Sequence, residues 1–392
     1  MSRTTNDRVL LCFRFSIAVT VFSTGLIAVV PQPTATFWKA SLLLSEGGYW
    51  LAALAIPIFL GWRRSPVHLV ATVLAFIGTA LLVSPVIQAF LIGRPLPDQL
   101  SEQFGMHITS TSTFDEKRQV PLSLSHLIMG ISSSDVIVDE HVYDVVDGYK
   151  LTLDLYRPKF AEGQLPIVVM IHGGAWTTGN KRDLPSLNEY LAARGYVVAA
   201  ISYRLVPFVS FPAPQRDVSR AIDYLKGLTD THGVDSERIA LVGRSAGGQI
   251  ALLAAYNAPD SSVRGVVSFY APTALRWGYS NPAKPGIIDS SAVLDAYLGG
   301  PPTSYGEKYN EAEPSRFVNQ STPPTLLIQG LRDEHVSPFH AEFVSARLIE
   351  ADVPHFLLRL PWATHGCDYF FRGPCGQIST FAIEWFLETV LK

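Results

Sequence analysis

The feature that most constrains the fold of this 392-residue chain is a series of six short apolar runs separated by stretches with helical periodicity. Strands buried on both faces of a sheet read as continuous apolar runs, and LPIVVMI at 165–171 has that character. The alternation predicts an α/β fold over residues 135–392, with a mostly parallel central sheet flanked by helices. A further stretch, KLTLDLYRP at 150–158, alternates like an exposed antiparallel strand. The other apolar runs lie at 196–205, 238–243, 263–271, 324–330 and 355–361, and helices are expected at 187–194, 217–228, 246–256, 338–350 and 378–391.

The stretch GRSAG at 243–247 lies where one apolar run meets an expected helix. A serine on such a strand-to-helix turn is crowded, so the residues two positions away on each side must be small, as Gly243 and Gly247 are. The pattern therefore predicts that Ser245 is a nucleophile raised above the carboxyl edge of the sheet. A serine hydroxyl is a weak nucleophile until a base takes its proton, so this interpretation requires partners elsewhere in the chain.

Three other loops at predicted strand ends supply those partners. HGGAW at 172–176 offers the backbone N–H groups of Gly173 and Gly174 to an oxyanion, and the N–H of Ala246 is a third donor. Asp333 in GLRDEHVSP and His365 in LPWATHGCD each follow a predicted strand. The order of serine, acid and histidine is that of the α/β-hydrolase triad, and several strand-end loops in this order make coincidence a poor explanation.

Some neighbouring residues are rivals for these roles. His172 is better explained as a structural residue that holds the HGG loop than as the base. Glu334 and His335 adjoin Asp333, but we expect them to be surface charges or solvated loop residues, because Asp333 has the strand-end position of the acid.

Residues 135–392 resemble the α/β-hydrolase superfamily through the stretches HGGAWTTGNK, SYRL, DVSRAIDYL, VGRSAGGQIALLAA, PPTLLIQGLRDEHV and THGCD. The likeness is closest to the BD-FAE-like group, and then to hormone-sensitive-lipase-like esterases. It implies that Ser245 is the nucleophile, Asp333 the acid and His365 the base, with the same three oxyanion donors. It also implies metal-free hydrolysis of carboxylic esters through an acyl-enzyme, with no cofactor. Prenylcysteine methylesterase-like and formamidase-like members share these motifs, so the acyl and leaving groups stay open.

One residue near the predicted site departs from the family pattern, and one segment of the site is less defined by it. Arg244 precedes the serine where many relatives carry an acidic or neutral residue, and an ion pair beneath the site is favoured over contact with a polar or anionic substrate. The segment 273–320 is too long for a plain loop between strands. We expect it to form a small cap in which Trp277, Tyr279 and Tyr297 limit the acyl pocket.

Apolar residues are concentrated in the first 94 residues, and they give the whole chain a positive mean hydropathy of +0.21. Apolar runs at 15–30, 47–62 and 67–92 predict about three transmembrane helices, since a span needs about 20 mostly apolar residues. The third run is long enough by itself, whereas the first two need flanking residues. A cleaved signal peptide is the alternative for the first run, although no clear cleavage site follows it. Aromatic residues near the run ends fit a membrane-interface belt: Trp38, Tyr49, Trp50 and Trp62.

Positive charge sets the expected orientation of this segment. Arg3 and Arg8 precede the first run, and Arg63 and Arg64 separate the second from the third, which predicts that both places are cytoplasmic. Three spans would then deliver the rest of the chain to the extracytoplasmic side of a plasma or inner membrane.

Two charged residues and a polar stretch complete this segment. Arg14 and Glu46 interrupt the apolar pattern and are expected near an interface, because charge at the bilayer centre is costly. Residues 95–134 are mixed and polar, with the run 110–113, and are expected to form a tether with a short amphipathic helix near 98–104.

Cysteine usage and net charge add two further constraints. A disulfide between Cys367 and Cys375 is plausible on an oxidising side of the membrane, and two free thiols fit the spacing equally well. A net charge of −3 gives no reason to expect nucleic-acid binding.

These observations predict a membrane-anchored serine carboxylesterase acting on a small-molecule or lipid-like ester, with its oligomeric state open. The alternatives are a peptidase or amidase on the same fold, which the HGG loop disfavours, and a degenerate hydrolase serving as sensor or scaffold. The complete set of triad residues argues against the scaffold.

Overall fold

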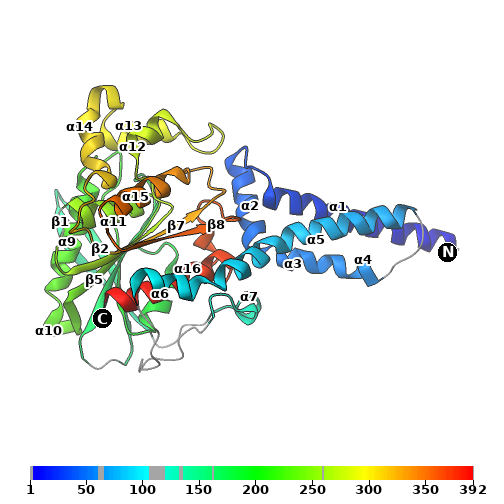
Figure 1. Ribbon diagram of the computed structural model, residues 1–392, viewed down its shortest axis with the longest axis horizontal. Helices are drawn as coiled ribbons and strands as arrows, with labels where there is room; N and C mark the ends of the chain where they lie inside the picture. Colours follow the sequence, from blue (N-terminus) through cyan, green and yellow to red (C-terminus); the bar gives the residue numbers. More distant parts are fainter. Residues whose placement is uncertain are drawn as a thin grey trace.

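The computed structural model describes residues 3–60, 66–105, 120–131, 136–160, 163–257 and 260–391 (Figure 1). Several places named above lie outside the described residues. They are Trp62 with Arg63 and Arg64, the polar run 110–113 of the expected tether, and residue 135, where the α/β part was expected to begin. The side chains of Arg3 and Arg8 are likewise outside what the structure describes.

Eight strands form one sheet in the order β1-β2-β4-β3-β5-β6-β7-β8. All neighbours from β4 to β8 are parallel, whereas β2 is antiparallel to both β1 and β4. The predicted mostly parallel sheet is therefore confirmed. The strands are β1 Val136–Val146, β2 Tyr149–Pro158, β3 Leu165–Ile171, β4 Val197–Ile201, β5 Val234–Arg244, β6 Val263–Phe269, β7 Thr325–Gly330 and β8 His355–Leu360.

The register of the parallel strands brings their carboxyl ends to one edge of the sheet. Ile171 of β3 pairs with Gly243 of β5, and Gly330 of β7 pairs with Leu360 of β8. The loops that follow these strands therefore leave the sheet side by side. This register is what allows residues far apart in the sequence to meet above a single edge.

Two strands differ from the sequence-based expectation. The stretch 150–158 was predicted to be an exposed strand; it is antiparallel, but Leu153 and Leu155 in its middle are fully buried. The reason is that these leucines lie on the face of β2 that packs in the cluster containing α9, while β1 pairs along the outer edge of β2. The polar residues of β1 hid it from the pattern, because an edge strand need not be apolar on both faces.

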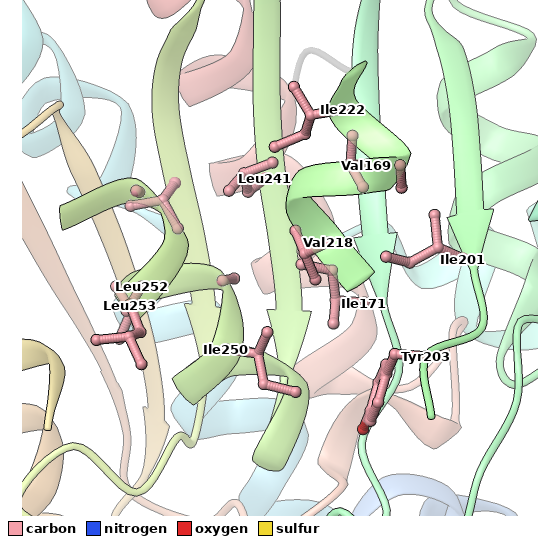
Figure 2. Packing of buried hydrophobic residues seen from close by; sticks show 14 of the residues in the cluster. Val169, Ile171, Ile201, Tyr203, Val218, Ile222, Leu241, Ile250, Leu252 and Leu253 are labelled. Carbon is pink, nitrogen blue, oxygen red and sulfur yellow. The ribbon is translucent and has the colours of Figure 1, made fainter. Parts of the chain in front are cut away.

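Helices cover both faces of the sheet and explain the continuous apolar runs. Along β3, Val169 and Ile171 face a cluster that includes α9 and α11, whereas Val168 and Met170 face a second cluster that includes α8 and α16. Figure 2 shows the first cluster between the strands and these two helices. The helices outside the cap and the N-terminal part are α8 Pro185–Ala192, α9 Ala213–Lys226, α10 Thr229–His232, α11 Ala246–Asn257, α15 Phe339–Glu350, η3 Cys367–Tyr369 and α16 Pro374–Val390.

The segment 273–320, expected to form a cap, contains short helices between β6 and β7 (Figure 1). It is fixed to the rest of the molecule through Gln249 of α11, whose Nε2 donates to the carbonyl oxygen of Ala312 at 2.6 Å. The helices are α12 Leu275–Ser280, α13 Ser290–Leu298, α14 Pro302–Ala312 and η2 Pro314–Arg316.

Long apolar helices project from one side of the sheet and form what we call the N-terminal arm, made of α1, α3, η1, α4 and α5 (Figure 1). Helix α2 lies where the arm meets the sheet-containing part. Within the arm, α1 and α5 pack closely through glycines, since a Cβ on Gly78 would lie 2.6 Å from the backbone nitrogen of Phe22. These elements are α1 Arg3–Val29, α2 Ala35–Gly47, α3 Tyr49–Ala52, η1 Ala53–Ala55, α4 Ile56–Leu60 and α5 Pro66–Gly93.

Within the described residues fewer long apolar helices are found than the three predicted, and the number of membrane spans stays a prediction. Two helical segments, Val9–Val29 and Val67–Gly93, are long and apolar enough to cross a membrane. The described part of the run 47–62 is divided into α3, η1 and α4 instead of forming one helix. Pro57 in this run lacks the backbone N–H that would continue an α-helix.

The stretch that follows α5 is packed where the structure describes it. Helix α6 Leu96–Phe104 is present where an amphipathic helix was expected, and its Leu96 and Leu100 are fully buried in the cluster that contains α16. Helix α7 Leu124–Met129 is held near the arm, because the hydroxyl of Tyr49 donates to the carbonyl oxygen of Leu127 at 2.9 Å.

Candidate active site

Ser245 stands on a sharp turn between β5 and α11. Its φ of 53° lies in the left-handed region, which a non-glycine residue adopts only when its surroundings hold it there. A Cβ on Gly243 would overlap the carbonyl oxygen of Gly247, and one on Gly247 would overlap that of His172. Positions 243 and 247, which were predicted to need small residues, therefore require glycine, because neighbouring backbone atoms occupy the space that a Cβ would take.

The structure brings Ser245, His365 and Asp333 together in a chain of hydrogen bonds. Nε2 of His365 lies 3.0 Å from Oγ of Ser245, and Nδ1 lies 2.7 Å from Oδ2 of Asp333. This arrangement lets the imidazole accept the serine proton on one nitrogen while the carboxylate holds the other. The catalytic roles of the three residues stay predictions.

Asp333 is buried and held by the loop that it begins. Its Oδ1 accepts the backbone N–H groups of His335 and Val336, both at 2.9 Å. Because Oδ1 is occupied in this way, Oδ2 is left to face His365. The loop thus sets the orientation of the carboxylate, and Nε2 of Gln329 also donates to Oδ2 at 3.4 Å.

The expected oxyanion donors lie beside the serine. Gly173, Gly174 and Ala246 line the same cavity as Ser245, and Ala246 begins helix α11. Gly174 has a φ of 110°, a conformation that favours glycine. The backbone of Gly173 also packs against the turn, since a Cβ there would lie 3.3 Å from that of Ser245.

His172 lines the cavity, but it contacts the HGG loop and Tyr203, and its Nδ1 lies 2.7 Å from the carbonyl oxygen of Gly173. Its ring stacks on Tyr203 with centroids 4.2 Å apart, and the hydroxyl of Tyr203 donates to the His172 carbonyl oxygen at 3.0 Å. Burial lowers the pKa of the His172 imidazole. These contacts agree with the structural role that was expected for His172, which stays a prediction.

A cavity of about 1020 Å³ opens over the serine and is bounded by the HGG loop, the cap and the loops that carry Asp333 and His365. Trp277, Leu275, Val293 and Leu294 give its cap side an apolar character. This volume is at the upper end of the roughly 300–1,000 Å³ typical of sites for drug-sized ligands.

The expected composition of the cap wall is correct for one aromatic residue and wrong for two. Trp277 lines the cavity, but Tyr297 and Tyr279 do not. Tyr297 is fully buried and stacks on Trp176 with centroids 4.2 Å apart, so it joins the cap to the HGG loop. The hydroxyl of Tyr279 instead donates to Asp295 within the cap, at 3.4 Å.

Arg244 forms the ion pair that was favoured for it. Its Nε donates to Oδ2 of Asp368 at 2.5 Å, and the hydroxyl of Tyr270 donates to Oδ1 of the same carboxylate at 2.5 Å. Tyr270 also lies against His365, with ring centroids 4.5 Å apart. Burial, and then the charge of Asp368, raises the pKa of Tyr270, which therefore stays protonated as a donor.

Of the two rivals to Asp333, one behaves as expected and the other does not. Glu334 pairs with Lys284 of the cap at 2.9 Å. His335 is not a solvated loop residue, because its ring stacks on that of His365 with centroids 4.9 Å apart. Burial, and then the proximity of His365, lowers the pKa of His335 to about 4, so it is neutral near pH 7.

Sequence reasoning missed Trp38, which was assigned to a membrane-interface belt. The structure places it on the wall of the cavity, where its indole N–H donates to the carbonyl oxygen of His365 at 3.0 Å. No local signal marks this contact, since the two residues are 327 positions apart.

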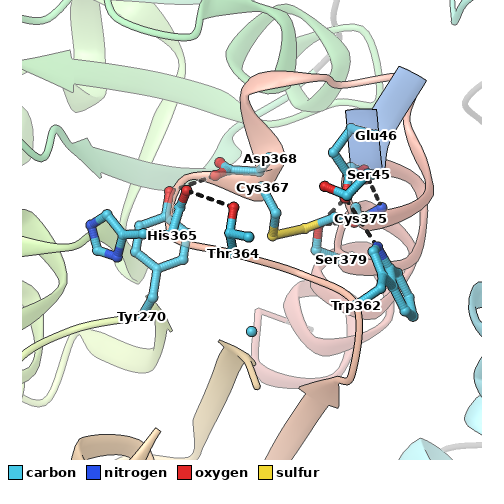
Figure 3. The surroundings of a disulfide bond; sticks show 12 residues. Ser45, Glu46, Tyr270, Trp362, Thr364, His365, Cys367, Asp368, Cys375 and Ser379 are labelled. Carbon is cyan, nitrogen blue, oxygen red and sulfur yellow. Dashed lines mark hydrogen bonds between the residues drawn. A yellow bond between two sulfur atoms is a disulfide. The ribbon is translucent and has the colours of Figure 1, made fainter. Parts of the chain in front are cut away.

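Cys367 and Cys375 form a disulfide, which decides between the two possibilities that the spacing left open. The bond closes the loop that follows His365 (Figure 3). Glu46 of α2 lies against this loop and is buried, so it does not have the interfacial position expected for it.

A sequence model of the BD-FAE family matches residues 153–348, which are 196 of the 392 residues and contain Ser245, Asp333 and the HGG loop. The chain belongs to the BD-FAE family. This assignment agrees with the resemblance seen in the sequence motifs. His365 lies beyond the matched range and is placed at the site by the fold.

Two curated relatives of this BD-FAE protein come from Mycobacterium tuberculosis. The probable carboxylic ester hydrolase LipM is 29% identical over 61% of the chain, and the esterase LipC is 30% identical over 61% of the chain. The alignments cover 58% and 62% of those two proteins, so the chain spans about three fifths of the length of the relatives it matches.

Among solved structures, a bacterial heroin esterase superposes with a TM-score of 0.58. It is 24% identical to this BD-FAE protein, and the match covers 68% of this chain and 88% of that one. At this level of identity the likeness shows the fold, which is that of the α/β-hydrolases.

Proposed function

We propose that this protein is a membrane-anchored serine carboxylesterase. The observation that carries the proposal is the hydrogen-bonded series from Ser245 through His365 to Asp333, at the floor of a large cavity. Membership of the BD-FAE family and the ester hydrolases among its relatives support the reaction class.

In the proposed acylation step, Oγ of Ser245 forms a bond to the ester carbonyl carbon while its proton passes to Nε2 of His365. Asp333 stabilises the imidazolium that results. The carbonyl oxygen becomes an oxyanion, which the backbone N–H groups of Gly173 and Ala246 stabilise together with that of Gly174.

Collapse of this intermediate breaks the bond to the alcohol oxygen, and His365 donates its proton to the departing alcohol. Water then attacks the acyl carbon of the Ser245 ester and gives a proton to His365. A second collapse breaks the bond to Oγ, the proton returns to Ser245, and the carboxylic acid is released.

The volume and apolar cap side of the cavity favour an ester with a bulky or long acyl or alcohol part over a small acetate. The arm adds a reason to expect a lipid-like substrate, because it would keep the site next to a bilayer. No cofactor or metal takes part in the proposed steps.

The arm is proposed to cross a membrane because its apolar side chains face outward. Phe13, Phe76, Phe90 and Leu91 are each more than half exposed, which is unusual for large apolar residues of a water-soluble helix pair. Inside the arm the contacts are made by small residues such as Gly25 and Gly78, as is common between membrane helices.

The proposed division is a membrane segment at 1–94, a connecting segment at 95–134 and a catalytic part at 135–392 with its cap at 273–320. In Figure 1 the N-terminus and the end of α4 lie at the far end of the arm from the sheet. With Arg3 and Arg8 on the cytoplasmic side, the catalytic part would be extracytoplasmic. The disulfide between Cys367 and Cys375 is consistent with an oxidising compartment.

The enzymatic proposal is tested with the full chain in detergent, a fluorophosphonate probe and p-nitrophenyl esters of increasing chain length. We expect labelling and turnover in the wild type, loss of both in Ser245→Ala, and no change in Ser321→Ala, a surface serine. Turnover of matched p-nitroanilides in preference to the esters would favour an amidase. Absence of labelling and turnover in folded wild type would favour a scaffold.

The orientation is tested in cells with a membrane-impermeant thiol reagent. Lys150→Cys, at an exposed position of β2, is placed in a Cys12→Ser background, because Cys12 is a free thiol. Labelling of intact cells supports an extracytoplasmic catalytic part. Labelling that appears only after lysis would contradict it.

A further inference from the structure

We propose that helix α2 is a working part of the active site, in which Trp38 and Glu46 position the loop that carries His365. This inference rests on the proposed esterase function. It goes beyond that function because α2, at the junction between the arm and the sheet-containing part, becomes necessary for the reaction. A membrane anchor alone would only determine where the enzyme is located.

Trp38 holds the loop at the catalytic histidine itself. Its indole N–H donates to the carbonyl oxygen of His365 at 3.0 Å, whereas the hydroxyl of Thr364 approaches the same oxygen at 3.5 Å. The indole ring also packs edge-on against His335, with centroids 4.4 Å apart, and His335 stacks on His365. Trp38 therefore contacts both the backbone of His365 and the ring that supports its imidazole.

Glu46, two turns further along α2, holds the two ends of the same loop. Its Oε1 accepts the indole N–H of Trp362 at 3.0 Å, and its Oε2 accepts the backbone N–H of Cys375 at 2.9 Å (Figure 3). Trp362 precedes His365 by three positions, and Cys375 closes the loop through its disulfide with Cys367. One side chain thus spans the loop from its beginning to its end.

The short stretch before α2 is fixed to the other loops of the site. The guanidinium of Arg332, next to Asp333, donates to the carbonyl oxygens of Ala28 and Val30, the latter at 2.6 Å. The backbone N–H of Ala35 donates to the carbonyl oxygen of Gly286 in the cap at 2.8 Å. The residues from the end of α1 through α2 therefore contact the acid loop, the histidine loop and the cap.

These contacts matter because His365 must hydrogen-bond to Ser245 when it takes the serine proton and to the leaving alcohol when it donates that proton. A displacement of about 1 Å in a catalytic group can lower a rate by about a hundredfold. Removing the Trp38 contacts leaves the backbone of His365 without its nearest donor, so we expect kcat to fall by roughly tenfold to a hundredfold.

The test uses the full chain in detergent and compares Trp38→Ala, Trp38→Phe and Glu46→Gln with Phe37→Ala. Phe37 is the neighbour of Trp38, is partly exposed and does not line the cavity. Trp38→Phe keeps an aromatic ring against His335 but removes the donor. Glu46→Gln keeps one acceptor and turns an NH₂ group toward a former donor. Circular dichroism and thiol counting establish that each variant is folded with its disulfide intact.

A positioning role predicts that kcat falls while KM changes much less. The kcat of Trp38→Ala should be the lowest, that of Trp38→Phe should be intermediate, and that of the wild type should be the highest. Glu46→Gln should also lower kcat in assays above about pH 8, where the ionised carboxylate of Glu46 accepts with both oxygens. Phe37→Ala should match wild type. Fluorophosphonate labelling of Ser245 should slow in the same order.

Two outcomes would overturn the inference while leaving the esterase proposal intact. The first is an active Trp38→Ala variant with wild-type kcat, and the second is a change confined to KM, which would make Trp38 only a wall of the cavity. A folded wild type with no labelling and no turnover would instead overturn the proposed function and this inference together.

Discussion

The carboxylate of Asp333 faces the imidazole of His365 at 2.7 Å with one oxygen only, because backbone N–H groups of its own loop occupy the other. The proposed catalytic acid is therefore oriented by its own loop. This division of its two oxygens allows the charge and the position of the acid to be tested separately.

Replacing Asp333 by asparagine should lower kcat by on the order of a thousandfold or more, since the amide cannot stabilise an imidazolium as a carboxylate does. The fold should persist, because the amide oxygen can still accept the N–H groups of His335 and Val336. Turnover of p-nitrophenyl esters measures the loss. Glu350→Gln is the control, because its ion pair with Arg347 is exposed and neither residue lines the cavity. An active Asp333→Asn variant would mean that another residue is the acid.

The stability of the protein should depend on pH through Glu46, which lies outside the arm. Burial raises the pKa of this carboxyl from 4.5 to about 8. Because the folded pKa exceeds the unfolded one, the stabilisation is complete below about pH 4.5 and is lost as pH rises through about 8. Wild type should therefore lose stability relative to Glu46→Gln between pH 5 and 8, by at most about 1.4 kcal/mol per pH unit. Thermal melts of both proteins would refute this if their difference stayed constant.

His340 should give the opposite dependence at acid pH. Its Nδ1 accepts the backbone N–H groups of Thr273 and Ala274 at 3.2 and 3.1 Å, and burial lowers its pKa to about 4. The neutral ring is the folded form, so its stabilisation is present above about pH 6.5 and is lost as pH falls through about 4. The difference in Tm between wild type and His340→Gln should shrink over this range. A constant difference would show that the ring does not titrate there.

The buried side of α6 should contribute to the stability of the whole sheet-containing part. Leu100 is fully buried against the cluster that includes α16, so Leu100→Ala should cost about 2–5 kcal/mol of unfolding free energy. Leu124→Ala, at an exposed position of α7, should change it by less than about 0.5 kcal/mol. Equal Tm values for the two variants would contradict the packing. For the same reason, a shortened chain that begins at residue 136 should melt earlier than the full chain.

The close approach of α1 and α5 should make Gly78 intolerant of a side chain. In Gly78→Val a Cβ would meet the backbone of Phe22, and we expect a loss of about 1–3 kcal/mol, seen as a lower Tm in detergent. Gly47→Ala is the control, because a Cβ there has no heavy atom within 4 Å. If both variants melted together, the two helices would not pack as described.

The loops of the candidate site could be found in the sequence because each follows a local pattern. Ser245, Asp333 and His365 lie at the ends of apolar strands, and parallel strands bring such ends to one edge. The contribution of α2 could not be found in this way, since Trp38 meets His365 only through the packing of distant elements. Glu46 was a partial signal, because a buried carboxylate needs donors and the apolar run around it offers none.

The errors in the cap and the arm have related causes. Tyr297 was expected at the cavity because aromatic residues often line pockets. Its ring is instead buried in the core, where it stacks on Trp176. The run 47–62 looked like a span because composition alone does not register how Pro57 divides a helix.

The packing of α6 against α16 sets an order of events during synthesis. Leu100 leaves the ribosome 278 residues before Ile378, one of its partners in the second cluster, so at roughly 5–20 residues per second it waits on the order of tens of seconds for that partner. Throughout that interval an apolar surface beside the newly made arm is uncovered. A chaperone or the bilayer itself would have to shield it, so the yield of folded protein should depend on the rate of translation as well as on the final stability.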